Sequence, residues 1–253
     1  MKLTEKQRAA RRAAFQQMSF TEKAEHIWTY YKMPIILGLI GLYLLCSAVH
    51  HQLTKKEVVL YSAHINVSAG DALASQLNEG FISATGADPK KSEVYFYRGI
   101  YLSNDPSSEN HQYAYASRLK MMAAIEAKQL DIVLMNREAY DIFSQKGYLL
   151  DLNSLLSQND SLHQLLEPHL TTNTVIIDDN AIEYALNEAK RYQAITEEIT
   201  NGIDVSMFPV FQQAGFPASV YLGVMPNSPR FPAVIEYIEY LAAEQSVDER
   251  LAG

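Results

Sequence analysis

The stretch Leu130–Leu152, LDIVLMNREAYDIFSQKGYLLDL, decides the fold class of this chain. Its first six residues, Leu130–Met135, are almost wholly apolar and predict a strand covered on both faces. Asn136 then suits the N-cap of a short helix, and Gly147 suits the left-handed position just after one. A second apolar run begins at Tyr148. The stretch therefore predicts the strand–helix unit of an α/β protein.

Strand-like and helix-like segments alternate on both sides of this stretch. Apolar, β-branched runs predict strands at Glu57–Val67, Glu93–Leu102 and Ala218–Pro226. Periodic apolar residues predict helices over 68–86, 111–129 and 228–245. Such alternation favours a mostly parallel sheet with right-handed crossovers and flanking helices.

The helical periodicity also predicts which side chains face the core. In the first helix these are Leu73, Leu77 and Phe81, with Asp71 as the N-cap and Gly86 as the stop. In the second helix the predicted apolar stripe consists of Tyr115, Leu119, Met122 and Ile125. In the last helix it consists of Val234, Ile238 and Leu241.

Residues 158–217 give a weaker pattern. A helix is expected over 161–170 and a strand over 173–178. The segment 181–199 fits either a helix or a twisted hairpin, because its periodicity does not separate the two. Residues 201–217 predict irregular chain.

An uncharged apolar run, Met33–Val49, precedes the α/β pattern. Seventeen helical residues extend about 25 Å, which is at the short end of what crosses a bilayer. Trp28 lies just before the run, together with two tyrosines, and Lys55 and Lys56 follow it. Aromatic rings favour the headgroup level. The sequence therefore predicts a transmembrane helix over residues 33–50.

The first 32 residues predict a cytoplasmic, basic and amphipathic segment. They carry seven Lys or Arg and three Glu, a balance of +4, which favours a cytoplasmic N-terminus. Ser19 and Glu22 fit a capping box for a short helix ahead of Pro34, which is expected to redirect the chain. Cleavage is the alternative, but this segment is long for a signal peptide, and no small residue precedes Cys46 as in a lipoprotein.

Residues 54–253 are expected to form one extracytoplasmic domain. After residue 32 the chain has 14 basic and 26 acidic residues, a balance of −12. That charge argues against a nucleic-acid partner, because binding the phosphate backbone needs Lys and Arg. Cys46 is the single cysteine, so the sequence has no disulfide within the chain and no cysteine metal site. About 200 residues suffice to bury a stable core.

The residues Asp131–Val133 and Gly147–Leu152, with the later VYLGVMPNSPRFPAVIEYIEYL, resemble extracellular solute-binding proteins of the type II periplasmic-binding-protein fold. The segment 18–45 resembles the anchor of membrane-tethered proteins of monoderm bacteria. Together these stretches cover about half of the chain. The resemblance implies an α/β binding domain outside the cell. Only about 200 residues are left for it, so the second lobe is expected to be reduced or absent, and hinge closure with it.

Ligands of open α/β sheets bind beyond the carboxyl ends of the strands. This rule selects polar residues after three of the predicted strands, and Ser68 to Gly70 could also hold an anion through backbone N–H groups. An ordinary loop with an N-cap is the alternative. The candidate ligand-binding residues are Asn66, Ser68, Gly70, Asp71, Asn136, Arg137, Asn227 and Ser228.

Motifs for catalysis, metal binding or cofactor binding are not found. Ser117 and Lys120 match Ser-x-x-Lys but lack the accompanying motifs. His163 and His169 are poorly spaced for a metal, and the pair Asp178–Asp179 fits a solvated turn. No phosphate-binding or nucleophile-elbow motif occurs. No enzymatic activity, cofactor or metal is therefore expected.

Two functions are consistent with these patterns. The first is a single-pass membrane-anchored extracytoplasmic module that binds a small solute or presents it to a membrane partner such as a transporter protein. The second is an envelope interaction module that has lost ligand binding and contacts other proteins through a sheet edge or cleft. Tyr95–Tyr101 and Tyr113–Tyr115 are candidates for such an interface, with core packing as the alternative.

Overall fold

The computed structural model describes residues 19–105, 110–157, 159–186, 191–216 and 218–243. The chain divides into two compact units, Met1–Lys55 and Lys56–Gly253. The basic residues Arg8, Arg11 and Arg12 lie outside the described residues.

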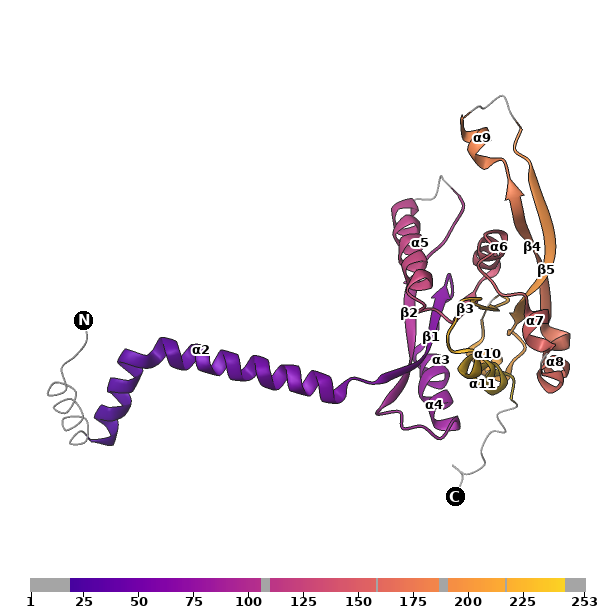
Figure 1. Ribbon diagram of the computed structural model, residues 1–253. Helices are drawn as coiled ribbons and strands as arrows, with labels where there is room; N and C mark the ends of the chain where they lie inside the picture. The colour runs from indigo at the N-terminus through magenta and orange to yellow at the C-terminus, as the bar shows by residue number, and fades with distance from the viewer. Residues whose placement is uncertain (1–18, 106–109, 158, 187–190, 217, 244–253) are drawn as a thin grey trace, which may run out of the picture. The chain divides into compact units, whose positions relative to one another are not determined.

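The first unit contains one long helix, α2 (Phe20–Thr54), which begins directly after the expected cap residue Ser19. The helix continues through Pro34, so the proline does not end it as expected. A proline inside a helix removes one backbone hydrogen bond and typically bends it. Figure 1 shows a bend in α2 between a shorter first part and a longer second part. Among the residues that the structure describes, no helix has the combined length and apolar character needed to cross a membrane.

The second unit contains a six-stranded sheet in the order β2-β1-β3-β6-β5-β4. The strands are β1 (Glu57–Ile65), β2 (Ser92–Ile100), β3 (Ile132–Met135), β4 (Leu170–Asp179), β5 (Ala194–Asp204) and β6 (Tyr221–Val224). β1 pairs in parallel with β2 and β3. The other three pairings, β3–β6, β6–β5 and β5–β4, are antiparallel. The prediction of an α/β sheet is confirmed, but the sheet is mixed, so the prediction that it is mostly parallel is wrong.

Helices cover both faces of this sheet (Figure 1). One face carries α3 (Asp71–Ser75), the π-helical turn Gln76–Gly80, α4 (Phe81–Ala84), α7 (Leu152–Leu156), α8 (Asp160–Leu166), α10 (Pro209–Ala214) and α11 (Phe231–Ala242). The other face carries α5 (His111–Glu126) and α6 (Arg137–Gln145). A short 3-10 turn, Glu167–His169, and α9 (Ala181–Leu186) complete the elements.

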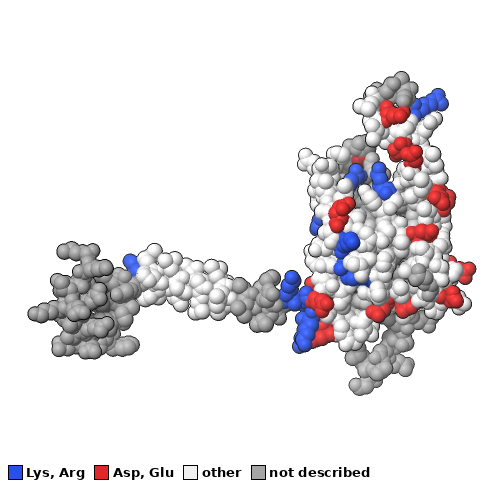
Figure 2. All heavy atoms as spheres, in the orientation of Figure 1, with Lys and Arg blue, Asp and Glu red and all other residues white. Residues whose placement is uncertain are grey.

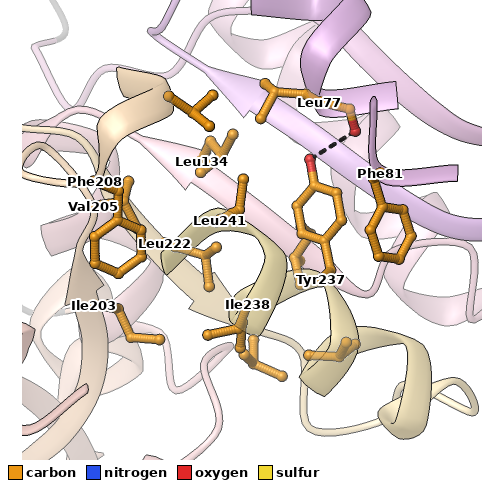
Figure 3. Packing of buried hydrophobic residues seen from close by; sticks show 14 of the residues in the cluster. Leu77, Phe81, Leu134, Ile203, Val205, Phe208, Leu222, Tyr237, Ile238 and Leu241 are labelled. Atoms are coloured by element: carbon orange, nitrogen blue, oxygen red, sulfur yellow. Dashed lines mark hydrogen bonds between the residues drawn. The ribbon is translucent and has the colours of Figure 1, made fainter. Parts of the chain in front are cut away.

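The larger core lies under α4 and α11. Leu77, Phe81 and Tyr237 pack there, and the Tyr237 hydroxyl donates a 3.1 Å hydrogen bond to the Leu77 carbonyl (Figure 3). The expected inward residues of the first and last helices are all buried, which confirms those two faces. Burial of such side chains stabilises the fold by about 1.5–3 kcal/mol each.

The apolar stripe predicted for α5 is wrong for three of its four residues, whereas Ile125 is partly buried against the second core. Tyr115, Leu119 and Met122 are 59%, 48% and 45% exposed. Instead α5 lays its smaller side chains on the sheet, and these are Ala114, Ser117 and Ala124, together with Met121.

The undecided segment 181–199 contains a short helix and a strand. β4 and β5 form a long antiparallel hairpin whose end carries α9. The expectation of irregular chain over 201–217 is wrong, because β5 runs on to Asp204 and α10 follows. In Figure 1 the far end of this hairpin extends beyond the rest of the second unit.

Candidate functional site

The two asparagines at the carboxyl end of the parallel strands hold local backbone. Asn66 adopts a left-handed conformation, with φ 56°. Its side chain donates to the Leu102 carbonyl at 2.6 Å and accepts from the Leu102 N–H at 2.9 Å. Asn136 caps α6 by accepting from the Ala139 N–H at 3.0 Å, as expected. Both side chains therefore stabilise the backbone that follows the strands. The side-chain oxygen of each asparagine is already hydrogen-bonded to the protein and is less available to a ligand.

Arg137 is the most prominent charged group at this edge. Its guanidinium lies 5.7 Å from the ring centroids of both Tyr140 and Tyr221 and pairs with Asp141 at 3.0 Å. A hydrogen bond with the Tyr221 hydroxyl is the main cause that raises the pKa of Arg137. The Arg137 side chain is 57% exposed, which makes it available for an anion.

The other candidates after β1 lie at the exposed start of α3. Gly70 takes the N-cap position and Asp71 is the first helical residue, so the prediction of Asp71 as N-cap is wrong by one position. Ser68, Gly70 and Asp71 are exposed.

Asn227 and Ser228 lie at the opposite edge of the sheet, so their prediction at the same edge is wrong. β6 is antiparallel to β3, and its register places Val224 beside Ile132, at the amino end of β3. The Asn227 amide donates to the Ile125 carbonyl at 2.8 Å, and the Ser228 hydroxyl donates to Asp131 at 2.6 Å. The eight predicted residues are therefore not brought together in one site.

Asp131 is the centre of a buried polar cluster at that amino edge. It is fully buried and accepts hydrogen bonds from the Tyr61 N–H at 2.8 Å and from Ser228. Arg230 pairs with it at 2.8 Å and lies 4.6 Å from the Tyr61 ring centroid. The cluster joins β1, β3 and the loop after β6. In the sequence, the only sign of this cluster is a carboxylate, Asp131, next to a buried strand. The sequence does not indicate that Arg230 is its partner.

A second buried network joins α6 to the hairpin. The Tyr140 hydroxyl donates to Asn201 at 2.8 Å, and the Asn201 amide donates to the Ser144 hydroxyl at 2.8 Å. Ser144 in turn donates to the Thr174 carbonyl at 3.1 Å. A Cβ added at Gly202 would lie 2.6 Å from the Tyr140 ring. Sequence reasoning missed this network, because its members are distant in the chain and match no motif.

His64 is a buried ionisable group that sequence reasoning also missed. It is 3% exposed, its ring lies 4.8 Å from that of Phe96, and burial, followed by the charge of Arg98, lowers its pKa to about 4. The His64 Nε2 and Ser62 Oγ atoms are buried without a hydrogen-bond partner in the described part of the chain. His64 is therefore neutral at physiological pH and belongs to the core rather than to an open site.

The groups considered for catalysis do not come together. Ser117 accepts from the Tyr101 N–H at 3.2 Å, while the Lys120 ammonium lies 5.5 Å from the Tyr97 ring centroid. His169 packs on Phe208 with 5.0 Å between ring centroids. Within the described ranges, no three His, Cys, Asp or Glu side chains are grouped as a metal site would need.

The end of the hairpin is the most exposed apolar part of the second unit. We define the arm as residues 176–186 and 191–196. Asn180 holds its two sides together, accepting from the Gln193 N–H at 2.7 Å and donating to the Arg191 carbonyl at 3.0 Å. Six large apolar side chains of the arm are exposed, from 45% to 83%, namely Ile177, Ile182, Tyr184, Leu186, Tyr192 and Ile195.

The described residues of the arm carry three acidic side chains and one basic side chain. In the view of Figure 2, acidic side chains lie along the arm and the side with β4 and β5. Asp178, Asp179 and Glu183 lie on the arm itself. Basic side chains in that view lie in the middle of the second unit, at its lower left and at the arm. The arm therefore combines exposed apolar groups with negative charge.

A cavity of about 350 Å³ lies between α5 and α6. Its wall is mostly apolar, and its charged lining residues are Arg118 and Lys146. The lining residues are Leu102, Asn104, Arg118, Met121, Met122, Ile125, Ile142, Phe143, Lys146 and Tyr148. None of the eight predicted site residues is among them.

Comparison with known proteins found no matching family model, no matching curated protein and no matching solved structure.

Proposed function

We propose that this chain is a membrane-tethered interaction module without enzymatic activity, which docks onto another envelope protein through the arm. The carrying observation is the set of six large apolar side chains exposed on the arm. Contiguous exposed apolar groups are typical of interaction sites. The acidic residues between them favour a partner surface that is apolar with a basic rim.

The proposed tether is the run Met33–Val49, with the N-terminus in the cytoplasm and the second unit outside. Along α2 the apolar side chains of this run are exposed, among them Leu37, Leu39 and Leu45 at 61–64%. Side chains of that kind find a favourable environment in lipid. The +4 balance before the run and the −12 balance after it support this orientation.

The sheet order supports a shortened form of the type II binding-protein fold. β6 runs antiparallel between β3 and β5, in the place of the return strand that the resemblance implies. Residues Lys56–Gly253 form one compact unit rather than two lobes. Without two lobes there is no hinge closure, which favours interaction over tight solute capture.

Site-specific photo-crosslinking in cells tests the proposal. A benzophenone amino acid replaces Ile182 or Leu186 in the full chain, which are 78% and 83% exposed. The matched control carries it at Leu165, an apolar residue of α8 that is 42% exposed. We expect one discrete crosslinked species from both arm positions, identified by mass spectrometry as an envelope protein, and none from the control.

A triple variant, Ile182→Ser, Leu186→Ser and Ile195→Ser, provides the second part of the test. Each substitution is at an exposed position and should change the free energy of unfolding by no more than about 0.5 kcal/mol. The benzophenone amino acid is placed at Tyr184, with and without the three substitutions. The crosslinked species should be seen without them and should be absent with them. A crosslink that persists, equal crosslinking from Leu165, or a product with twice the mass of the chain would refute docking of the arm onto another protein.

Small-solute binding is the second candidate function. The cavity between α5 and α6 favours it, since about 350 Å³ falls in the range of small-molecule sites.

A further inference from the structure

The cavity between α5 and α6 has the composition of a ligand site. Its lining includes three almost fully buried side chains, with Met121 and Phe143 each 2% exposed and Ile142 7%. Met122, next to Met121 in α5, also lines it. Methionine side chains are flexible and polarizable and adapt to ligands of different shapes.

The polar residues that line the cavity supply a side-chain amide, a tyrosine hydroxyl and two cations. Arg118 reaches the Ser103 carbonyl and the Asn104 side-chain oxygen only at 3.5 Å, the limit of a hydrogen bond, so much of its donor capacity remains for a ligand. Neither Arg118 nor Lys146 forms an ion pair with any residue of the described ranges. No acidic residue lines this cavity.

The two cations differ in shape rather than in acidic neighbours. Each also lines a second cavity that contains acidic residues, Lys146 with Asp178 and Asp179, and Arg118 with Asp105. We take Arg118 as the main contact for a carboxylate, because its planar guanidinium can donate two parallel hydrogen bonds to one.

We infer that this cavity binds a small monocarboxylate with an aromatic or branched apolar body. The apolar body lies against Met121, Met122 and Phe143, and the carboxylate meets Arg118 at the mouth. This inference rests on the second candidate function and is independent of the tether and of the arm. It places the ligand on a helix-covered face of the sheet rather than beyond the strand ends.

Methyl NMR of the full chain in lipid nanodiscs tests the inference. The chain has eight methionines, and ¹³C-methyl labelling reports on Met121 and Met122 separately from Met207, which is 63% exposed and outside the cavity. The probe is 3-phenylpropionate and its matched control is the neutral 3-phenylpropan-1-ol. We expect saturable shifts of the Met121 and Met122 signals with the acid, an affinity about tenfold lower with the alcohol, and no shift of Met207.

Two variants separate the apolar and the charged part of the site. Arg118→Gln should lower the affinity for the acid about tenfold or more and leave that for the alcohol unchanged. Met122→Trp fills the cavity and should abolish the Met121 shift with both probes. An unshifted signal of Met225, which is 0% exposed and outside the cavity, in each variant shows that the fold is kept. Absence of saturable shifts at millimolar probe, equal affinities for acid and alcohol, or an undiminished affinity of Arg118→Gln would overturn the inference.

Discussion

Asp131 carries a buried negative charge whose partners come from β1 and from the loop after β6. It lies at the start of β3, its N–H donates to the Tyr61 carbonyl at 2.9 Å, and Arg230 and Ser228 reach it from the loop after β6. The positive charge of Arg230 compensates the buried carboxylate of Asp131, so the intact pair destabilises the fold little. Removing one partner would leave the other as an uncompensated charge in the interior.

We predict that Asp131→Asn lowers the free energy of unfolding of the full chain by about 3 kcal/mol, because it leaves the partly buried Arg230 unpaired. The matched control is Asp141→Asn at the surface ion pair with Arg137, which should cost less than about 1 kcal/mol. Urea unfolding in one detergent, followed by circular dichroism, measures both. Equal losses would mean that the buried pair has no special role.

His64 makes the stability of the second unit depend on pH. Its pKa falls from 6.5 in the unfolded chain to about 4 in the folded one, so folding favours the neutral form. The stabilisation is complete above pH 6.5 and is lost as the pH falls through 6.5 towards 4, to a limit of about 3 kcal/mol. We predict that His64→Phe, next to Phe96, removes this part of the acid sensitivity.

The measurement is the difference in free energy of unfolding between wild type and His64→Phe at pH 7 and at pH 4.5. Carboxylates titrate in both proteins, so the difference isolates His64. A difference that does not change between the two pH values would contradict the buried neutral state.

At the scale of elements, the end of α6 shows a complete C-cap. The Tyr148 N–H donates to the Phe143 carbonyl at 3.1 Å and the Gly147 N–H to the Ser144 carbonyl at 2.8 Å. Gly147 has φ 66°, and the rings of Phe143 and Tyr148 pack edge to face at 5.6 Å. These are the bonds and the apolar contact of a Schellman motif. The motif directs the chain from α6 back towards β6, where the Leu150 N–H meets the Val224 carbonyl.

We predict that Gly147→Ala lowers the free energy of unfolding by about 1–2 kcal/mol, because a Cβ disfavours the left-handed conformation. The space itself is adequate, since the nearest atom to such a Cβ would be 3.8 Å away on Val175. Gly147→Asn is the control, because asparagine tolerates the left-handed conformation at this position better than alanine does. Thermal unfolding should separate the two variants clearly, and similar melting temperatures would argue against the cap.

Local rules located the elements better than the site. Asn136 and Gly147 were recognised because capping depends on residues within one helical turn. The direction of β6 was not recognised, because the sequence of a four-residue apolar strand does not indicate which strand it pairs with. Since β6 is antiparallel to β3, Asn227 and Ser228 lie at the other edge. The face of α5 was mistaken because the helix buries mainly small side chains, and the prediction followed the large apolar ones.

At the scale of the whole molecule, two proposals remain separable. The arm predicts a protein partner, and the run Met33–Val49 predicts a tether that keeps the second unit outside the cell. The membrane location is proposed from the amino-acid composition of the first fifty residues and the charge of the rest. The arm could be recognised only in the structure, because it is formed by the pairing of β4 with β5. The tether is the central claim, because an envelope partner requires that location.

Cysteine accessibility in intact bacterial cells tests the tether most directly. Cys46, the single cysteine, is replaced by Ser, and one new cysteine is placed at Gln164 in the second unit or at Ser19 before the apolar run. A membrane-impermeant maleimide should label Gln164→Cys in intact cells, and Ser19→Cys only after the cells are permeabilised. Labelling of Gln164→Cys that requires permeabilisation, or recovery of the full chain in the soluble fraction, would contradict the account.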